Sequence, residues 1–447
     1  MKILHTADLH LGAGRNSDNT RAERFQVFRR ILSLIEQENI DILIISGDFL
    51  EQDRLQAEEF NEIITLLDQS RAEIYISPGN HDPASPISLY RNREIWPRNV
   101  HVFIEPEAVV SRLHKLVIAG AAFKNLYQRE TLLNDISEAA NNLRLNLEQA
   151  EDYLFLASLH GEVLTASSSL YNPILKSDIE NSPFDYLALG HIHKPDLEIL
   201  SAGETLYAQA GTPQALDKGD YGIRGAYILN FKNHRLNKKS YVSLAVRTYL
   251  NLNVQLNKVA NNEDLLFAIE RELEKVELDY QNQVENLSSV EGFGTEYIWN
   301  IYLSGTTKID YKINLEAIRN ILDDNGLNIA SLQDNSSLDI DGYKLGAEDS
   351  LRGLFYRKIR DRIDILETEL LKYKDVEDAL KIGEQALSEK ILEYNFEKNR
   401  IDLEFSNESL SQNPEFNRKS QEFEKLKTDI ALLNRALELG LNSFRGE

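Results

Sequence analysis

The stretch Ile3-Leu4-His5-Thr6-Ala7-Asp8-Leu9-His10 decides the fold of this chain. Its first half predicts a short buried strand, and the polar side chains of Asp8 and His10 follow where the apolar run ends. The same arrangement of a strand followed by polar residues recurs at Gly47-Asp48, Gly79-Asn80-His81-Asp82, His160-Gly161 and Gly190-His191-Ile192-His193. Because ligands bind beyond the carboxyl ends of the strands in open α/β sheets, we expect these five ends to meet in one cleft.

Strand-like runs alternate with helical patterns around these motifs. The runs cover residues 3–7, 42–45, 74–76, 117–119, 153–159 and 186–189. Between the first two, apolar residues recur at helical spacing and predict a helix that packs on the sheet: Phe25, Phe28, Leu32 and Ile35. The alternation predicts an α/β domain over residues 1–245.

Two further regions follow this domain. Residues 246–347 predict a small α+β domain, with strands at 249–256 and 297–302 and helices near 263–276 and 314–323. Residues 348–447 predict a helical region. Its first apolar stripe consists of Leu351, Phe355, Ile359, Ile363, Leu366 and Leu370, and its second of Phe416, Phe423, Leu426, Ile430, Leu433 and Leu437.

Composition narrows the chemistry. The chain has 447 residues and no cysteine, which excludes disulfides, thiolate metal ligands and thiol nucleophiles. An apolar run long enough for a membrane span is absent from the sequence, and we expect a cytoplasmic protein without membrane contact. The net charge of −23 counts against tight, non-specific DNA binding by this chain alone.

The residues at the five strand ends suit metal ions. Carboxylate, amide oxygen and imidazole without thiolate favour Mn²⁺ first, with Fe or Zn as possible alternatives. Two such ions about 3.5–4 Å apart can share a carboxylate and clamp a phosphoryl group, and Asp48 is the natural bridge. Each motif alone is explained as well by a turn, a helix cap or a buried histidine. Their joint occurrence favours a two-metal site.

Taken together, the motifs Asp8-X-His10, Gly47-Asp48, Gly79-Asn80-His81-Asp82, His160 and Gly190-His191-X-His193 resemble those of calcineurin-like metallophosphoesterases. The opening Thr6-Ala7-Asp8-Leu9-His10-Leu11-Gly12 is similar to that of SbcD-type exonucleases, the bacterial relatives of the Mre nucleases. This resemblance implies a sandwich of two mixed sheets flanked by helices, with a small α+β cap and a helical tail. It also implies a Mn-dependent DNA exonuclease or endonuclease subunit of a bacterial double-strand-break repair complex.

The resemblance also implies roles for single residues. One metal would be held by Asp8, His10, Asp48 and His193, and the other by Asp48, Asn80, His160 and His191. A hydroxide bridging the metals would attack the phosphate, while His81 would contact the phosphate and act as the acid. Glu51 departs from the family pattern, in which a histidine or aspartate occupies this position. It either hydrogen-bonds His81 or is a solvated loop acid.

Partners follow from the same resemblance. Since the sequence contains no P-loop motif, an SbcC/Rad-type coiled-coil ATPase would bind through the C-terminal helices at 348–447. Residues 246–347 would form a capping domain that positions DNA, and the chain would form a homodimer. Two alternatives stay open, namely a hydrolase of cyclic nucleotides or phosphomonoesters and a non-catalytic scaffold. Intact residues at all seven ligand positions count against the scaffold.

Overall fold

The computed structural model describes residues 1–14, 19–164, 169–257, 259–307, 311–338, 342–373 and 414–443. The chain forms two compact units. The first comprises Met1–Leu252, Arg271–Ile301 and Arg319–Leu332, and the second comprises Asn253–Glu270, Tyr302–Ile318 and Gln333–Glu447. The domain boundaries expected at 245 and 347 stay predictions.

The first sheet of the first unit brings three of the polar motifs to one edge. Its strands, in spatial order, are β14 (Arg235–Ser243), β13 (Gly225–Lys232), β1 (Lys2–Thr6), β2 (Ile42–Ile45), β3 (Glu73–Ile76) and β4 (Val100–Val102). Strands β1 to β4 are parallel, whereas β13 and β14 are antiparallel additions. Because β1, β2 and β3 run the same way, their carboxyl ends lie together.

The second sheet supplies the other two motifs. Its strands, in spatial order, are β11 (Leu200–Ala202), β12 (Thr205–Gln209), β10 (Tyr186–Gly190), β7 (Leu154–His160), β6 (Leu116–Gly120) and β5 (Glu107–Ser111). The four central strands are parallel, and the two edge strands are antiparallel. Gly190 pairs with His160, which places the ends of β10 and β7 side by side.

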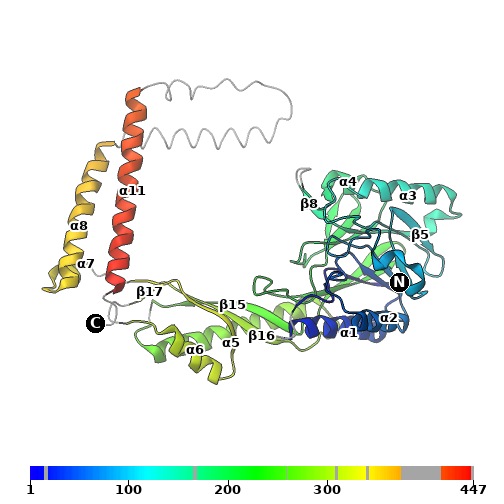
Figure 1. Cartoon of the computed structure of the whole chain (residues 1–447), viewed down its shortest axis with the longest axis horizontal. Coiled ribbons are helices and arrows are strands. Elements are labelled where there is room, and N and C mark those ends of the chain that lie inside the picture. Colours follow the sequence, from blue (N-terminus) through cyan, green and yellow to red (C-terminus); the bar gives the residue numbers. More distant parts are fainter. Residues whose placement is uncertain are drawn as a thin grey trace. The chain divides into compact units, whose positions relative to one another are not determined.

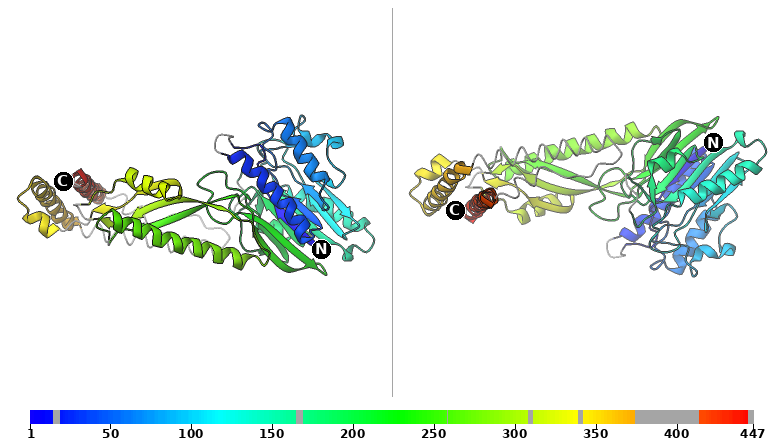
Figure 2. Two further views of the ribbon diagram at one scale, coloured as in Figure 1. Left: turned by 90° about the horizontal axis from the view of Figure 1, so that it is seen from below. Right: turned by 90° about the horizontal axis from the view of Figure 1, so that it is seen from above.

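Helices cover the outer face of each sheet. The first sheet is covered by α1 (Thr20–Glu38) and α2 (Ala57–Asp68), and the second by α3 (Leu133–Asn146) and α4 (Lys176–Glu180) (Figure 1). The right-hand view of Figure 2 also shows α3 and the blue helices on opposite sides of the sheets. The architecture confirms the predicted fold of two mixed sheets flanked by helices. Short 3₁₀ helices occur at Leu89–Arg91, Arg93–Ile95 and Ala150–Asp152.

Buried hydroxyl groups join the two sheets next to the motif edge. The Ser77 hydroxyl donates to the carbonyl oxygen of Ser158 at 2.8 Å and lies 3.0 Å from its hydroxyl oxygen. Ser46, directly after β2, places its hydroxyl oxygen 3.2 Å from that of Ser158. All three serines are fully buried, so each hydroxyl depends on the opposite sheet for a hydrogen-bond partner. These contacts hold the two sets of strand ends in register.

The remaining elements lie outside the two large sheets. They are the sheet of β15 (Arg247–Gln255), β16 (Glu296–Ser304) and β18 (Asn328–Asp334), the pairs β8 (Glu162–Leu164) with β9 (Pro173–Leu175) and β17 (Thr306–Thr307) with β19 (Ser337–Leu338), and the helices α5 (Asn262–Leu287) and α6 (Leu315–Asp324). The predicted strands and helices of this region are therefore present. Helix α5 extends 11 residues beyond the predicted end at 276, because its polar second half is rich in good helix formers.

The C-terminal elements are α7 (Gly342–Ala347), α8 (Leu351–Leu370) with a final 3₁₀ turn at Leu371–Tyr373, and α11 (Pro414–Ser443). Helices α8 and α11 lie side by side and antiparallel (Figure 1). Phe355 packs against the cluster that contains Leu437 and Leu441, and Tyr373 donates a hydrogen bond to Glu422. Residues 374–413 of the predicted helical region lie outside the described residues. Among the described helices, none combines the length and apolar character that a membrane span requires.

We predict that Phe28→Ala lowers the free energy of unfolding by about 3–5 kcal/mol, because it leaves a cavity in the core. Phe28 in α1 is fully buried, and its ring lies 5.6 Å from that of Phe49, which follows Asp48. Chemical denaturation followed by circular dichroism measures the change. Leu145→Ala in α3 is the control, because Leu145 is 84% exposed and its loss should change stability by less than about 0.5 kcal/mol. Equal effects of the two substitutions would contradict the prediction.

Candidate metal centre

The backbone turns sharply at the strand ends to present the candidate ligands. Asp8, His10, Asp48 and His191 adopt φ values of 54°, 47°, 47° and 94°. Non-glycine residues rarely occupy this left-handed region, and each such position costs about 1–3 kcal/mol. Backbone hydrogen bonds offset part of that cost, since the Asp8 N–H donates to Gly47 and the His10 N–H to Asp48 at 3.0 and 2.9 Å.

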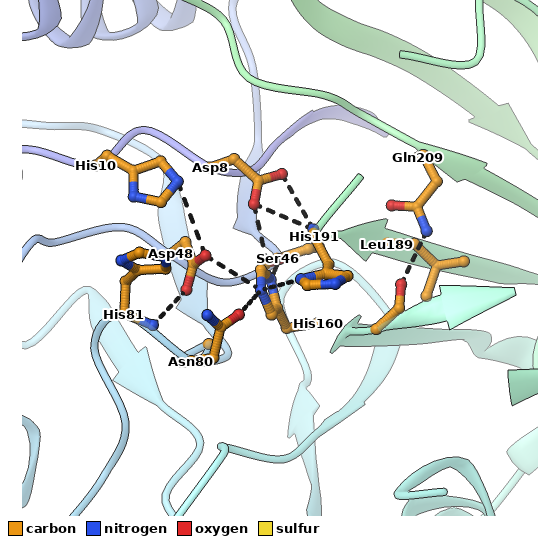
Figure 3. Close-up of polar contacts among 12 residues, drawn as sticks. Asp8, His10, Ser46, Asp48, Asn80, His81, His160, Leu189, His191 and Gln209 are labelled. Carbon is orange, nitrogen blue, oxygen red and sulfur yellow. Dashed lines mark hydrogen bonds and ion pairs between the residues drawn. The ribbon is translucent and has the colours of Figure 1, made fainter. Parts of the chain in front are cut away.

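Asp48 lies at the centre of the cluster (Figure 3). Its Oδ1 accepts a hydrogen bond from the backbone N–H of His81 at 2.9 Å, which fixes the carboxylate. Its Oδ2 lies 3.3 Å from Nε2 of His160 and 3.7 Å from Nε2 of His10. One oxygen therefore faces imidazoles on both sides, which is the position of a bridging ligand.

The first group of ligand atoms lies on the His10 side of Asp48. Ligand atoms of Asp8, His10 and His193 all lie within 4.8 Å of one another. The two oxygens of Asp8 each accept from the backbone N–H of His191 at 3.1 Å, so the second sheet orients a carboxylate of the first. Such spacing fits one cation with mixed carboxylate and imidazole ligands.

The second group converges on Nε2 of His160. This nitrogen lies 3.0 Å from Oδ1 of Asn80 and 3.3 Å from Nδ1 of His191, in addition to its contact with Asp48. Figure 3 shows these side chains pointing toward one another from both sheets. The group offers a carboxylate, an amide oxygen and two imidazoles to a second cation.

Outer hydrogen bonds leave one nitrogen of three imidazoles free to face the cluster. The partners are the Ser46 carbonyl for Nδ1 of His160 at 3.1 Å, Glu51 for Nδ1 of His10 at 3.3 Å, and Glu162 for Nε2 of His191 at 3.0 Å. Such partners fix the tautomer of a metal-binding histidine. Nε2 of His10 is then buried without a hydrogen-bond partner. A buried polar atom in this state fits coordination of a cation.

The electrostatics of the cluster favour positive charge. Burial, reinforced by Asp48, raises the pKa of Asp8 to about 7. Burial opposes the charged imidazole of His160, but Asp48 outweighs it and raises the pKa of His160 to about 9. Despite its own burial, Asp48 has a lowered pKa because His160 and His10 lie beside it. Cations would compete with these protons, so metal affinity should fall as the pH falls.

Two glycines permit the close approach of the ligands. Gly47 has φ of 93°, and a Cβ there would overlap the His160 ring. A Cβ on Gly79 would overlap the Asp48 carboxylate. Gly47 and Gly79, which precede the candidate ligands Asp48 and Asn80, are thus required for the close packing of the cluster.

The structure brings all nine candidate residues of the sequence analysis together. Around Asp48 lie Asp8, His10, Asn80, His81, His160, His191 and His193, with Glu51 beside two of them. Glu51 contacts Nδ1 of His81 at 3.2 Å as well as His10. This hydrogen bond raises the pKa of His81, whose side chain is 44% exposed. The catalytic and ligand roles of these residues stay proposals.

Sequence reasoning missed the residues that hold the ligands in place. Asp82 accepts hydrogen bonds from the backbone N–H groups of Leu50 and Gly79 and from the hydroxyl of Tyr90, and so joins two of the loops. Glu162 was missed as well. Asp82 belongs to the motif Gly79-Asn80-His81-Asp82 and could have been noticed from the sequence. The role of Glu162 depends on the direction of the short strand β8, which the sequence does not reveal.

We predict that Gly47→Ala yields a folded protein with strongly reduced metal binding, because the added methyl group must displace His160. Titration calorimetry with Mn²⁺ and circular dichroism measure binding and folding. Gly222→Ala is a matched control, since Gly222 also has positive φ (86°) but no atom lies within 4 Å of a Cβ there. Equal loss of Mn²⁺ binding in both variants would show that backbone strain, and not the contact with His160, explains the effect.

Residues 1–195 match the model of the calcineurin-like phosphoesterase family. This range contains all the motifs described above.

Several curated proteins are similar to the chain. The "Uncharacterized metallophosphoesterase YhaO" of Bacillus subtilis is 25% identical over 255 residues, covering 52% of this chain and 58% of the relative. A protein of the same organism that is named as part of the nuclease SbcCD is 25% identical over 254 residues, covering 50% and 64%. "DNA double-strand break repair protein Mre11" of Methanocaldococcus jannaschii is 22% identical over 283 residues, covering 58% and 71%. The chain thus matches less than two thirds of the length of the first two relatives.

Proposed function

We propose that the chain is a metal-dependent phosphodiesterase that hydrolyses DNA as the nuclease subunit of a bacterial double-strand-break repair complex, since residues 1–195 match the model of the calcineurin-like phosphoesterase family. The observation that carries the proposal is the position of Asp48, whose Oδ2 lies between His10 and His160 at 3.7 and 3.3 Å. The names of the relatives favour DNA as the substrate.

Two sets of residues fit the metals. Asp8, His10, Asp48 and His193 would hold one, and Asp48, Asn80, His160 and His191 the other. When bound, two divalent ions supply Lewis acid stabilisation of a phosphoryl group and activation of water. Mn²⁺ is the proposed ion, because imidazole and oxygen ligands without thiolate suit it.

His81 is the proposed acid. Glu51 binds Nδ1 of His81, which leaves Nε2 to donate a proton to the leaving oxygen. The backbone N–H of His81 binds Asp48, so its position is tied to the bridging carboxylate. Partial exposure of the His81 side chain gives a substrate phosphate access to it.

We predict that His81→Ala keeps both Mn²⁺ ions and lowers the hydrolysis of linear duplex DNA by about 10²–10⁴-fold, because it removes a general acid. A substrate with a p-nitrophenyl leaving group should lose much less activity, since that group departs without a proton. Nuclease assays with Mn²⁺, together with metal analysis, provide the measurement. Loss of metal from the variant, or equal losses on both substrates, would refute this role for His81.

Two comparisons complete the test. Glu51→Gln should slow DNA hydrolysis in the wild-type background and have a smaller effect in the His81→Ala background, because one of the two hydrogen bonds of Glu51 acts through His81 and the other through His10. Hydrolysis of a phosphomonoester or a cyclic nucleotide by the wild-type protein, without cleavage of DNA, would replace the nuclease proposal with the alternative hydrolase.

The C-terminal helices are the proposed binding site for a coiled-coil ATPase. Leu351, Leu432 and Leu439 are 72%, 60% and 61% exposed. Leu432 and Leu439 are seven residues apart and so share one face of α11. A helix with an exposed apolar face suits a partner helix, and one relative is named as a subunit of a nuclease. The homodimer and a DNA-positioning role for residues 246–347 are further parts of this proposal.

We predict that Leu432→Asp with Leu439→Asp abolishes binding of the full chain to the purified coiled-coil ATPase, because the charges cannot be buried in an apolar interface. Phosphodiesterase activity of the chain alone should stay unchanged. Asn434→Asp is the control, since it adds charge at an exposed polar position of the same helix. Size-exclusion chromatography of the mixture measures binding, and a complex that survives the double substitution would rule out this face.

A further inference from the structure

Glu162 holds the imidazole of His191 from outside the cluster. Its Oε1 lies 3.0 Å from Nε2 of His191, and the two side chains are 24% and 15% exposed. Since a carboxylate accepts hydrogen bonds, Nε2 carries the proton. Nδ1 of His191 then has a free lone pair that faces the cluster.

The lone pair on Nδ1 of His191 faces the lone pair on Nε2 of His160. Nδ1 of His191 lies 3.3 Å from Nε2 of His160, while the other nitrogen of His160 donates to the Ser46 carbonyl at 3.1 Å. Two lone pairs at this distance repel unless a proton or a cation lies between them. The hydrogen bond from His191 to Glu162 therefore keeps the ring in the orientation that suits a shared cation.

A second neighbour helps to hold the His191 ring in this orientation. The ring of Tyr171 lies 4.7 Å from that of His191 at an interplanar angle of 32°. Glu162 begins β8 and pairs with Pro173 of β9, whereas Tyr171 lies two residues before β9 and bridges Gln128. The imidazole has a fixed partner at its edge and another at its face.

The His10 side of the cluster depends on a different carboxylate. Glu51 divides its two oxygens between His10 at 3.3 Å and His81 at 3.2 Å. It comes from the loop after β2, whereas Glu162 follows β7 in the second sheet. Each group of ligands is thus oriented by its own acidic residue, and one can be altered without the other.

We propose that Glu162 is a positioning residue that sets the affinity of the metal position formed by Asp48, Asn80, His160 and His191, and leaves the other position unchanged. The inference rests on the proposed two-metal function. It gives the two positions separate tuning groups, Glu162 for one and Glu51 for the other. Loss of an outer partner of this kind typically weakens metal binding by about 10–100-fold.

The experiment uses Mn²⁺ as the probe and the full chain as wild type, Glu162→Ala, Glu162→Gln and Glu130→Gln. Titration calorimetry should show two Mn²⁺ equivalents in the wild type, and in Glu162→Ala one of them should weaken by about 10–100-fold. Electron paramagnetic resonance at intermediate Mn²⁺ should show a coupled pair in the wild type and a single isolated ion in Glu162→Ala. Glu162→Gln keeps an acceptor oxygen for Nε2 and should lose less affinity.

Glu130→Gln is the matched control for the change of charge, because Glu130 is exposed. This variant should bind both Mn²⁺ ions as the wild-type protein does. Equal weakening of both ions in Glu162→Ala, or no weakening in a variant that melts at the wild-type temperature, would overturn the inference. If the wild-type protein itself fails to bind two Mn²⁺ ions, the proposed function fails and the inference fails with it. If only the inference fails, the wild-type protein still binds two Mn²⁺ ions, so the two failures can be distinguished.

Discussion

The contact of one carboxylate oxygen with imidazoles from both sheets is the constraint on which the rest of the structure depends. Oδ2 of Asp48 lies between His10, which follows β1, and His160, which ends β7. These three buried polar groups are costly to bring together without compensation. The compensation comes from backbone N–H groups, outer carboxylates and the serine contacts between the sheets. The parallel strands make the arrangement possible by ending at one edge.

The cluster is obtained at a local energetic cost that the domain as a whole must offset. Several candidate ligands have positive φ, and the glycines before Asp48 and His191 allow atoms to approach more closely than a side chain would permit. The apolar cores on the outer faces of both sheets provide the offset. The ring contact between Phe28 and Phe49 connects the core of the first sheet to the ligand cluster, because Phe28 lies in α1 and Phe49 directly follows Asp48.

The ligands could be predicted from sequence because each follows an apolar run, a pattern that is local. The parallel strands β1, β2, β7 and β10 were predicted for the same reason, to within about a residue. The antiparallel strand β13 was not, since its place beside β1 depends on contacts across more than 200 residues, and β14 joins the sheet only through β13. The contact of Glu162 with His191 was also out of reach, because it depends on the path of the β8–β9 ribbon. Local sequence patterns therefore identified the candidate ligands, whereas the residues that hold those ligands in place depend on tertiary packing.

The division of the cluster between the sheets has a consequence for biosynthesis. Asp8, His10, Asp48 and Asn80 are translated before any strand of the second sheet, whereas His160 ends β7, the third strand of that sheet in chain order, and His191 and His193 follow β10. A nascent chain that ends before residue 191 lacks part of each ligand group, although the four parallel strands of the first sheet have already been translated. Assembly of the cluster therefore requires β1, β2 and β3 of the first sheet and β7 and β10 of the second to have been synthesised and joined, and a chain that ends before residue 191 cannot complete it.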